Sequence, residues 1–451
     1  MDTETETRPG LGAPPEASYL QHIRNFQPNA KLFLTTISIT QMCLAIFDVV
    51  FNLYLAAIGY SLTVIGVFAT MQMLGTAVTA LPAGMFSDRL GRKKSLLVAV
   101  GLSIVTTLGQ IFLTGSAAML LVLGFMRGAA TTFQTTLSAP FLMENSGPRE
   151  RIHLFSVNSS LNSISGTAGA ALAGLLPVAI AQAFGWNLAA DTHPLKLTLI
   201  TSVSLFVLSL IPISLIKENR RPAQSGSIVG ELRATLGSYA AQRLIVYSSL
   251  IGLGAGLVIP LSNLFLMRRF GAGVQQVSIV MTGSRLTLGV ATLFSPLLVR
   301  YLGRIRSVTV SQLTSIPMLL IIALVPNYWV VAAAFWFRNM FMNMSGPVSG
   351  AFTMEIVDER RRATTNGLTQ AASNLFQAIS VSVSGYVMDH ISLSLPYFGT
   401  ATLYATAALF WYFSFRRFES RGAGASRGVS RGESSGAQRP RKKAPSLASP
   451  V

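Results

Sequence analysis

The chain has 451 residues, of which 51% are hydrophobic and only 12% are charged, and its mean hydropathy is +0.51. This balance excludes an ordinary water-soluble protein and favours a chain that folds in a lipid bilayer. The formal net charge of +18 suggests nucleic-acid binding only until the basic residues are placed along the chain.

The first 30 residues are polar, contain four prolines and lack a cleavable hydrophobic region. We therefore expect residues 1–30 to be a cytoplasmic N-terminal tail, and the first apolar segment to serve as the insertion signal.

Apolar segments of about 20 residues, the length that crosses the bilayer core, then recur from Lys31 to Phe415. An α-helix satisfies its own backbone hydrogen bonds in lipid, so each segment is expected to be helical. The predicted fold class is all-α: a polytopic membrane protein with twelve transmembrane helices. The predicted spans are 31–57, 62–83, 95–114, 117–142, 154–181, 195–216, 244–267, 274–299, 308–325, 329–356, 364–390 and 393–415.

Basic residues gather on one side of this predicted topology. Of the 35 Lys and Arg residues, 29 fall in the N-terminal segment, in the even-numbered connections or after residue 415. This distribution follows the positive-inside rule and predicts that both termini are cytoplasmic. The simplest location is the cell (inner) membrane.

Several short motifs return at an almost constant shift, which indicates an internal repeat. The pairs are Asn52–Leu55 with Asn263–Leu266, Leu90–Arg92 with Leu302–Arg304, Arg127 with Arg338, and Glu144 with Glu355. The repeat predicts two pseudo-symmetric six-helix bundles, residues 31–216 and 244–415, joined by a cytoplasmic linker, residues 217–243. Residues 416–451 are rich in Arg, Gly, Ser and Pro and are expected to form a disordered basic cytoplasmic tail.

The connection after the second span, residues 84–94, has a distinctive pattern of glycines, one acid and several bases. Its glycines permit a tight turn, and its aspartate can accept hydrogen bonds from a neighbouring arginine. A short positive-inside loop alone explains the bases but not this spacing. The residues of interest are Gly84, Asp88, Arg89, Gly91 and Arg92.

With this loop between its second and third spans, the chain resembles the major facilitator superfamily from about Lys31 to Phe415. The resemblance implies two six-helix halves and a conformational lock formed by the loop, with Glu144 of the fourth span joining Asp88 and Arg92. Arg300 stands where Asp88 would repeat, so we expect an asymmetric lock, concentrated in the N-terminal half.

The resemblance extends to two further features. Arg127 is similar to the family's fourth-helix arginine, which is associated with proton coupling. A glycine signature of drug/proton antiporters is only partly present in Gly169–Gly174, because Ala170 replaces its proline. That replacement weakens the case for export.

Four charged side chains lie well inside predicted spans: Asp48, Arg127, Arg285 and Arg338. A charge at the centre of a span costs on the order of 3 kcal/mol even on the mildest scale, so each one needs a partner or a wet cavity. In the resembled fold the helices that carry them line a central cavity, whereas the uncharged third, sixth, ninth and twelfth spans lie at the periphery.

Asp48 shares a helical face with Asn52 and is the first candidate for proton coupling, together with Arg127. The alternative for Asp48 is a static ion pair. Arg285 has no counterpart in the first half, and it either contacts an anionic group of the solute or pairs with Asp48. Arg338 repeats Arg127 and belongs either to the shared mechanism or to the packing between helices.

Polar amides within the spans are weaker cavity candidates, because most such side chains only bond neighbouring helices. They are Gln134, Asn158, Asn162, Asn339, Asn343, Asn374 and Gln377.

These observations favour a secondary transporter that works by alternating access and is not an enzyme. No cofactor or metal is expected, since the four histidines lie at the ends of spans or outside them and Cys43 is the only cysteine. The expected partners are a small-molecule solute, a proton or other coupling ion, and membrane lipids, with no nucleic acid and a monomeric state.

The direction of transport is left open by the sequence. Methionine and aromatic residues near the tenth-span arginine slightly favour efflux of amphipathic compounds; these are Trp336, Phe337, Met340, Phe341, Met342 and Met344. The alternatives are an uptake symporter for a small metabolite and a transport-inactive membrane sensor on the same scaffold.

Overall fold

The computed structural model describes residues 26–147, 151–188, 190–217, 235–357 and 362–433, and it is helical nearly throughout. The first half comprises α2 (Pro28–Ala57), α3 (Leu62–Leu90), α4 (Arg92–Phe112), α5 (Ala117–Glu144), α6 (Arg151–Phe184), α7 (His193–Leu208) and α8 (Leu210–Leu215). The second half comprises α10 (Tyr239–Val258), α11 (Ser262–Phe270), α12 (Val274–Leu302), α13 (Arg304–Leu324), α14 (Tyr328–Met344), α15 (Gly346–Ile356), α16 (Arg362–His390) and α17 (Leu395–Glu433).

Among the described residues, eight helical segments are long and apolar enough to cross a membrane, six in the first half and two in the second. Helices also occupy the four other predicted spans, which correspond to α12, α14 with α15, α16 and α17. The all-α membrane fold is therefore confirmed, while the number of crossings stays a prediction. Large apolar side chains point outward along the bundles, as a lipid-facing surface requires; examples are Val105, Phe112, Ile211, Leu324 and Phe413.

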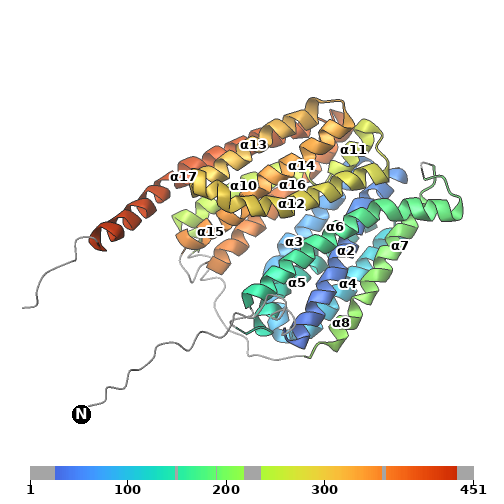
Figure 1. The fold of residues 1–451 in the computed structure, drawn as a ribbon. Coiled ribbons are helices and arrows are strands. Elements are labelled where there is room, and N and C mark those ends of the chain that lie inside the picture. Colours follow the sequence, from blue (N-terminus) through green and yellow to red (C-terminus); the bar gives the residue numbers. More distant parts are fainter. Residues whose placement is uncertain (1–25, 148–150, 189, 218–234, 358–361, 434–451) are drawn as a thin grey trace, which may run out of the picture.

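The helices form two bundles, which correspond to the two halves of the chain (Figure 1). In the first bundle α3 and α4 both pack on α5, and α2 packs on α6 and α7. In the second bundle α10 packs on α16 and α17, and α13 packs on α14 and α17. Figure 1 shows that α2 begins and α17 ends at the same end of the bundles, here named the proximal end; the opposite end is the distal end.

The two bundles meet through α3 with α16 and through α6 with α12. Near the distal end α3 and α16 touch backbone to backbone, because a Cβ atom on Gly66 would lie 3.1 Å from the Cα of Gly385. Thr63 donates to Asp389 nearby, at 3.0 Å between Oγ1 and Oδ2, and Ser278 of α12 donates to the carbonyl of Ala170. The distal end is thus closed by contacts between the halves.

Three predicted spans are broken into two helices each. The seventh span is interrupted between α10 and α11, where Pro260 has no backbone N–H to donate. The tenth is interrupted at Ser345, just before Gly346 and Pro347, and the sixth at Ser209. The first of these breaks lies beside the cavity described below.

Two predicted boundaries are corrected by the structure. The expected turn over residues 84–94 is mostly helical, since α3 continues to Leu90 and only Gly91, at φ 90°, reverses the chain before α4. Residues 416–433, expected to belong to a disordered tail, instead continue α17 to Glu433. Extending an existing helix avoids the cost of nucleation, which explains why these polar residues continue it. Residues 434–451 and 218–234 lie outside the described residues.

Candidate functional site

A cavity of about 460 Å³ lies between the two halves, and all four charged residues predicted within the spans line it. Its walls come from α2, α3 and α5 of the first half and from α10, α11, α12, α14 and α16 of the second. In the described residues, the helices that match the uncharged third, sixth, ninth and twelfth spans contribute nothing to this lining. Charge within a span was therefore a reliable guide to the cavity.

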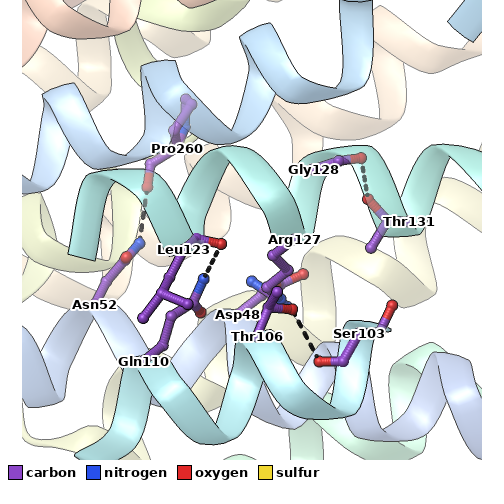
Figure 2. Close-up of polar contacts among 10 residues, drawn as sticks. All are labelled: Asp48, Asn52, Ser103, Thr106, Gln110, Leu123, Arg127, Gly128, Thr131 and Pro260. Carbon is purple, nitrogen blue, oxygen red and sulfur yellow. Dashed lines mark hydrogen bonds and ion pairs between the residues drawn. The ribbon is translucent and has the colours of Figure 1, made fainter. Parts of the chain in front are cut away.

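Asp48 of α2 forms an ion pair with Arg127 of α5, with 3.0 Å between Oδ1 and Nη2. The arginine side chain is 3% exposed and also lies over the ring of Phe47, 4.2 Å from the ring centroid, whereas the aspartate side chain is 52% exposed. Figure 2 shows the two side chains next to each other. The carboxylate thus faces the cavity, while its partner is held in the protein interior.

Arg338 of α14, the repeat of Arg127, has a different partner. Its Nη2 donates to the hydroxyl of Tyr404 of α17 at 2.9 Å, and both residues are buried. No acid pairs with it in the part of the chain that the structure describes. Arg338 therefore keeps its positive charge next to the cavity with a neutral partner.

Arg285 of α12 reaches the cavity without a protein partner. Across the described ranges, no hydrogen bond or ion pair joins it to another residue. Its guanidinium lies against Gly166 of α6, where an added Cβ atom would be 2.9 Å from Nη1. Of the two roles that the sequence left open for Arg285, pairing with Asp48 is thus not seen, since Asp48 binds Arg127 instead.

Two repeated asparagines bond across the halves at the distal side of the cavity. Asn52 of α2 donates to the carbonyl of Pro260 at 3.2 Å, as Figure 2 shows, and Asn263 of α11 donates to the carbonyl of Val49 at 3.3 Å. Both donors and both acceptors are related by the same shift of 211 residues. Only Asn52 was predicted as a cavity residue, although the repeat itself identifies Asn263.

Other polar residues of the cavity come from α3, α14 and α16. Asn339 and Gln377 line it, as expected from the sequence, and so do Gln72 and Thr76, which the sequence reading missed. Gln72 and Thr76 lie on α3, which has no charged residue near its middle. Because the sequence analysis located cavity helices by their buried charges, it did not identify α3.

Five predicted cavity amides lie outside the lining of this cavity in the described structure. Gln134 donates to the hydroxyl of Ser103 at 2.8 Å, which joins α5 to α4. Three others bond within their own helices: Asn162 donates to the carbonyl of Asn158, Asn343 donates to that of Asn339, and Asn374 accepts from the amide of Gln370. The amide oxygen of Asn158 has no hydrogen-bond partner in the described structure. The structure does not bring these residues together with the charged ones.

Two members of the predicted lock, Arg92 and Glu144, form an ion pair at the proximal end, 3.2 Å apart, while their role in a lock stays a prediction. The expected asymmetry is wrong for this pair, because Arg304 and Glu355 form the same ion pair in the second half. The reason is geometric: Gly91 and Gly303 both take positive φ, so α4 and α13 begin in the same way. Each presents its first arginine to the acid near the end of the following span in the same half. The backbone of Gly84, Asp88 and Arg89 belongs to α3, but the surroundings of Gly84 and the side chains of Asp88 and Arg89 are outside the described part of the structure.

The methionine and aromatic residues that favoured export do not line the cavity in the described structure. Phe337 is 51% exposed on the outside of its helix, and Met344 is buried in the core. Only Phe335, Arg338 and Asn339 of this helix reach the cavity.

Comparison with known proteins supports the architecture. The sequence model of the Major Facilitator Superfamily matches residues 33–250 and 244–448. The fold is similar to the nucleoside transporter NupG, with a TM-score of 0.69 and 16% identity over 86% of this chain and 99% of that one. It is also similar to a D-xylose-proton symporter, with a TM-score of 0.65 and 15% identity over 88% and 98% of the two chains.

Two further relatives were found. A bacterial homologue of the human lysosomal transporter Spinster, in an inward-facing and occupied conformation, has a TM-score of 0.66 and 15% identity over 90% of this chain and 98% of that one. A gallate transporter of Pseudomonas putida is 39% identical over 87 residues, which are 19% of either chain. This chain thus matches about a fifth of the length of that curated relative.

Proposed function

This chain belongs to the Major Facilitator Superfamily and is an integral membrane transporter rather than an enzyme, and from that premise we propose that it carries a small polar solute together with a proton. The single observation that carries the proposal is the Asp48–Arg127 pair, in which an accessible carboxylate and a buried guanidinium meet at the cavity between the halves.

Proton coupling follows from the unequal burial of that pair. When a proton from the cavity neutralises Asp48, Arg127 loses its only identified ionic partner while its charge stays in the interior. A buried cation without its counter-ion is costly, so protonation changes the relative free energies of conformations that surround Arg127 differently. Proton binding can in this way drive a conformational change without covalent chemistry.

Alternating access is supported by closure at one end. Asn52, Asn263 and Thr63 bond the halves together on the distal side of the cavity. If the termini are cytoplasmic, as the distribution of basic residues predicts, the distal end faces the outside and this structure is closed toward the outside. We propose the cell (inner) membrane as the protein's location and a monomer as its state.

The cavity favours a small polar metabolite over an amphipathic compound. Guanidinium and amide groups from both halves line it alongside apolar side chains such as Phe51 and Phe335, whereas the tenth-span methionine and aromatic positions that favoured export lie elsewhere. The local similarity to a gallate transporter agrees with a small hydrophilic solute. Uptake by symport therefore replaces export as the leading direction in this proposal.

The test is reconstitution of the full chain in liposomes that contain a pH-sensitive dye. Addition of nucleosides, sugars and hydroxylated benzoates in turn is expected to reveal a solute that moves protons inward with it. Protein-free liposomes and the Asp191→Asn variant, an acid-to-amide change outside the cavity, are the controls. Solute flux without proton movement would contradict coupling, and solute binding without flux would identify a sensor.

A further inference from the structure

The charges along the cavity do not balance. Arg127 and Asp48 neutralise each other, Arg338 has the neutral hydroxyl of Tyr404, and Arg285 has no partner among the residues that the structure describes. Two guanidinium charges thus face one cavity without a counter-ion from the described chain. Such charges inside a membrane protein are expensive unless a ligand or water compensates them.

We infer that the transported solute is a small organic anion whose carboxylate binds Arg285 of α12. This inference rests on the proposed function and adds to it the chemical class of the solute. Guanidinium and carboxylate groups match each other's planar geometry and form two parallel charge-assisted hydrogen bonds, which makes arginine a selective ligand for this group.

Arg285 is the better placed of the two uncompensated arginines. Its side chain is partly exposed at the cavity, whereas Arg338 is only 5% exposed and already donates to Tyr404. Gly166 leaves room for the Arg285 guanidinium beside α6, since any larger residue would press on it. We therefore assign direct contact to Arg285 and a longer-range electrostatic contribution to Arg338.

The remaining walls indicate the rest of the solute. Phe51 and Phe335 supply apolar faces, and Gln72 and Gln377 supply amide groups that bond hydroxyls. A cavity of about 460 Å³ is at the small end of the range for ligand sites. A compact carboxylate with a flat apolar body and a few hydroxyl groups satisfies these walls better than an inorganic anion, which would leave the aromatic faces unused.

The proposed anion sets the net charge that moves in each transport cycle. One proton on Asp48 and one monovalent anion at Arg285 add to a neutral load, so transport in a one-to-one ratio would be electroneutral. Accumulation would then depend on the pH gradient and not on the membrane potential.

The test is binding, measured by thermal stabilisation of the purified full chain in detergent, so that it does not depend on flux or coupling. The probes are benzoates and short hydroxycarboxylates, each paired with its uncharged carboxamide, and inorganic phosphate. We expect at least one carboxylate to bind about tenfold or more tightly than its carboxamide. The Arg285→Gln variant should lose this preference, and Arg285→Lys should keep part of it.

Two matched variants distinguish the position of the Arg285 guanidinium from the total positive charge of the protein. Gly166→Ala keeps the positive charge but displaces the guanidinium, and it should weaken carboxylate binding several-fold. Arg243→Gln removes a cation that lies outside the cavity lining and should leave binding unchanged. Equal affinity for acids and amides, or an undiminished preference in Arg285→Gln, overturns the inference, as does tighter binding of phosphate. Proton-coupled flux of an uncharged solute would overturn it while leaving the proposed function intact.

Discussion

The two halves of the molecule are alike in the ion pairs at their proximal ends and in the asparagine bonds between them, and they differ in the charged residues that line the cavity. Arg92–Glu144 and Arg304–Glu355 are equivalent ion pairs, and Asn52 and Asn263 make equivalent bonds to the opposite half. At the cavity, by contrast, Ile259 occupies the position that repeats Asp48, and Met73 lies near the position that repeats Arg285.

This difference assigns two kinds of task. A motion in which two bundles move against each other needs equivalent contacts on both sides, so the repeated residues keep their roles. In the proposed mechanism, proton binding needs one carboxylate and solute recognition needs one cationic anchor. The repeat symmetry is broken at both positions. Arg127 and Arg338 lie between these cases, because the residue is repeated but its partner is not.

The largest expected effect comes from Asp48, the acid that only the first half has. Asp48→Asn cannot release a proton, so accumulation of solute driven by a pH gradient should be lost, while exchange of solute across the membrane continues. Counterflow and gradient-driven uptake in proteoliposomes measure the two separately, with Asp191→Asn as the control. Accumulation at the unmodified level would remove Asp48 from the coupling mechanism.

The next effect tests whether Arg338 depends on its neutral partner. Tyr404→Phe removes a buried hydrogen bond to a charged group and should cost about 1.5–3 kcal/mol of stability. Tyr397→Phe is the matched control, since Tyr397 is equally buried and its hydroxyl has no hydrogen-bond partner in the described structure. Thermal unfolding in detergent should separate the two variants, and equal melting temperatures would contradict the assignment.

A smaller effect is expected from the reciprocal asparagines. Asn52→Ala and Asn263→Ala should each weaken distal closure by about 1 kcal/mol, which changes the ratio of closed to open molecules about fivefold. Distances between spin labels at the distal ends of α3 and α16 would report the shift. Asn162→Ala is the control, because that side chain bonds within its own helix. Unequal shifts in Asn52→Ala and Asn263→Ala would contradict the conclusion that the two asparagines make equivalent contacts.

The smallest effect concerns the proximal ion pairs. Glu355→Gln should change stability by less than about 1 kcal/mol, since both partners are about half exposed and water screens them. Glu144→Gln should have the larger effect of the two, because Arg92 and Glu144 are only 20% and 19% exposed. Melting temperatures at low and high salt would test this order, and high salt should reduce the Glu355→Gln effect first.

The sequence predicted the fold because hydropathy and backbone satisfaction leave few alternatives in a bilayer. It also predicted that Asp48, Arg127, Arg285 and Arg338 share a cavity, since an intramembrane charge has few other places to go. The free-energy cost of exposing a charged side chain to lipid is large enough to determine that it faces a cavity or a partner.

The positions of the uncharged amides and the choice of ion-pair partners could not be predicted from the sequence. An amide such as Gln134 is satisfied equally well by a cavity or by a neighbouring helix, so its residue type does not reveal the face on which it lies. The sequence left the ion-pair partner of Asp48 open among the arginines within the spans, and only the packing of α2 on its neighbours placed Arg127 beside it. The second Arg–Glu pair was visible as two separate repeats, but their meeting depended on the turn geometry at Gly303.

The close crossing of α3 and α16 has a consequence for how such a protein changes over evolutionary time. At Gly66 and Gly385 the halves touch through main-chain atoms, and the nearby side-chain bond from Thr63 to Asp389 lies outside the cavity lining in the described structure. Selection for a new solute can therefore rewrite the walls of the cavity without redesigning the joint, and a single mechanical framework can serve unrelated nutrients.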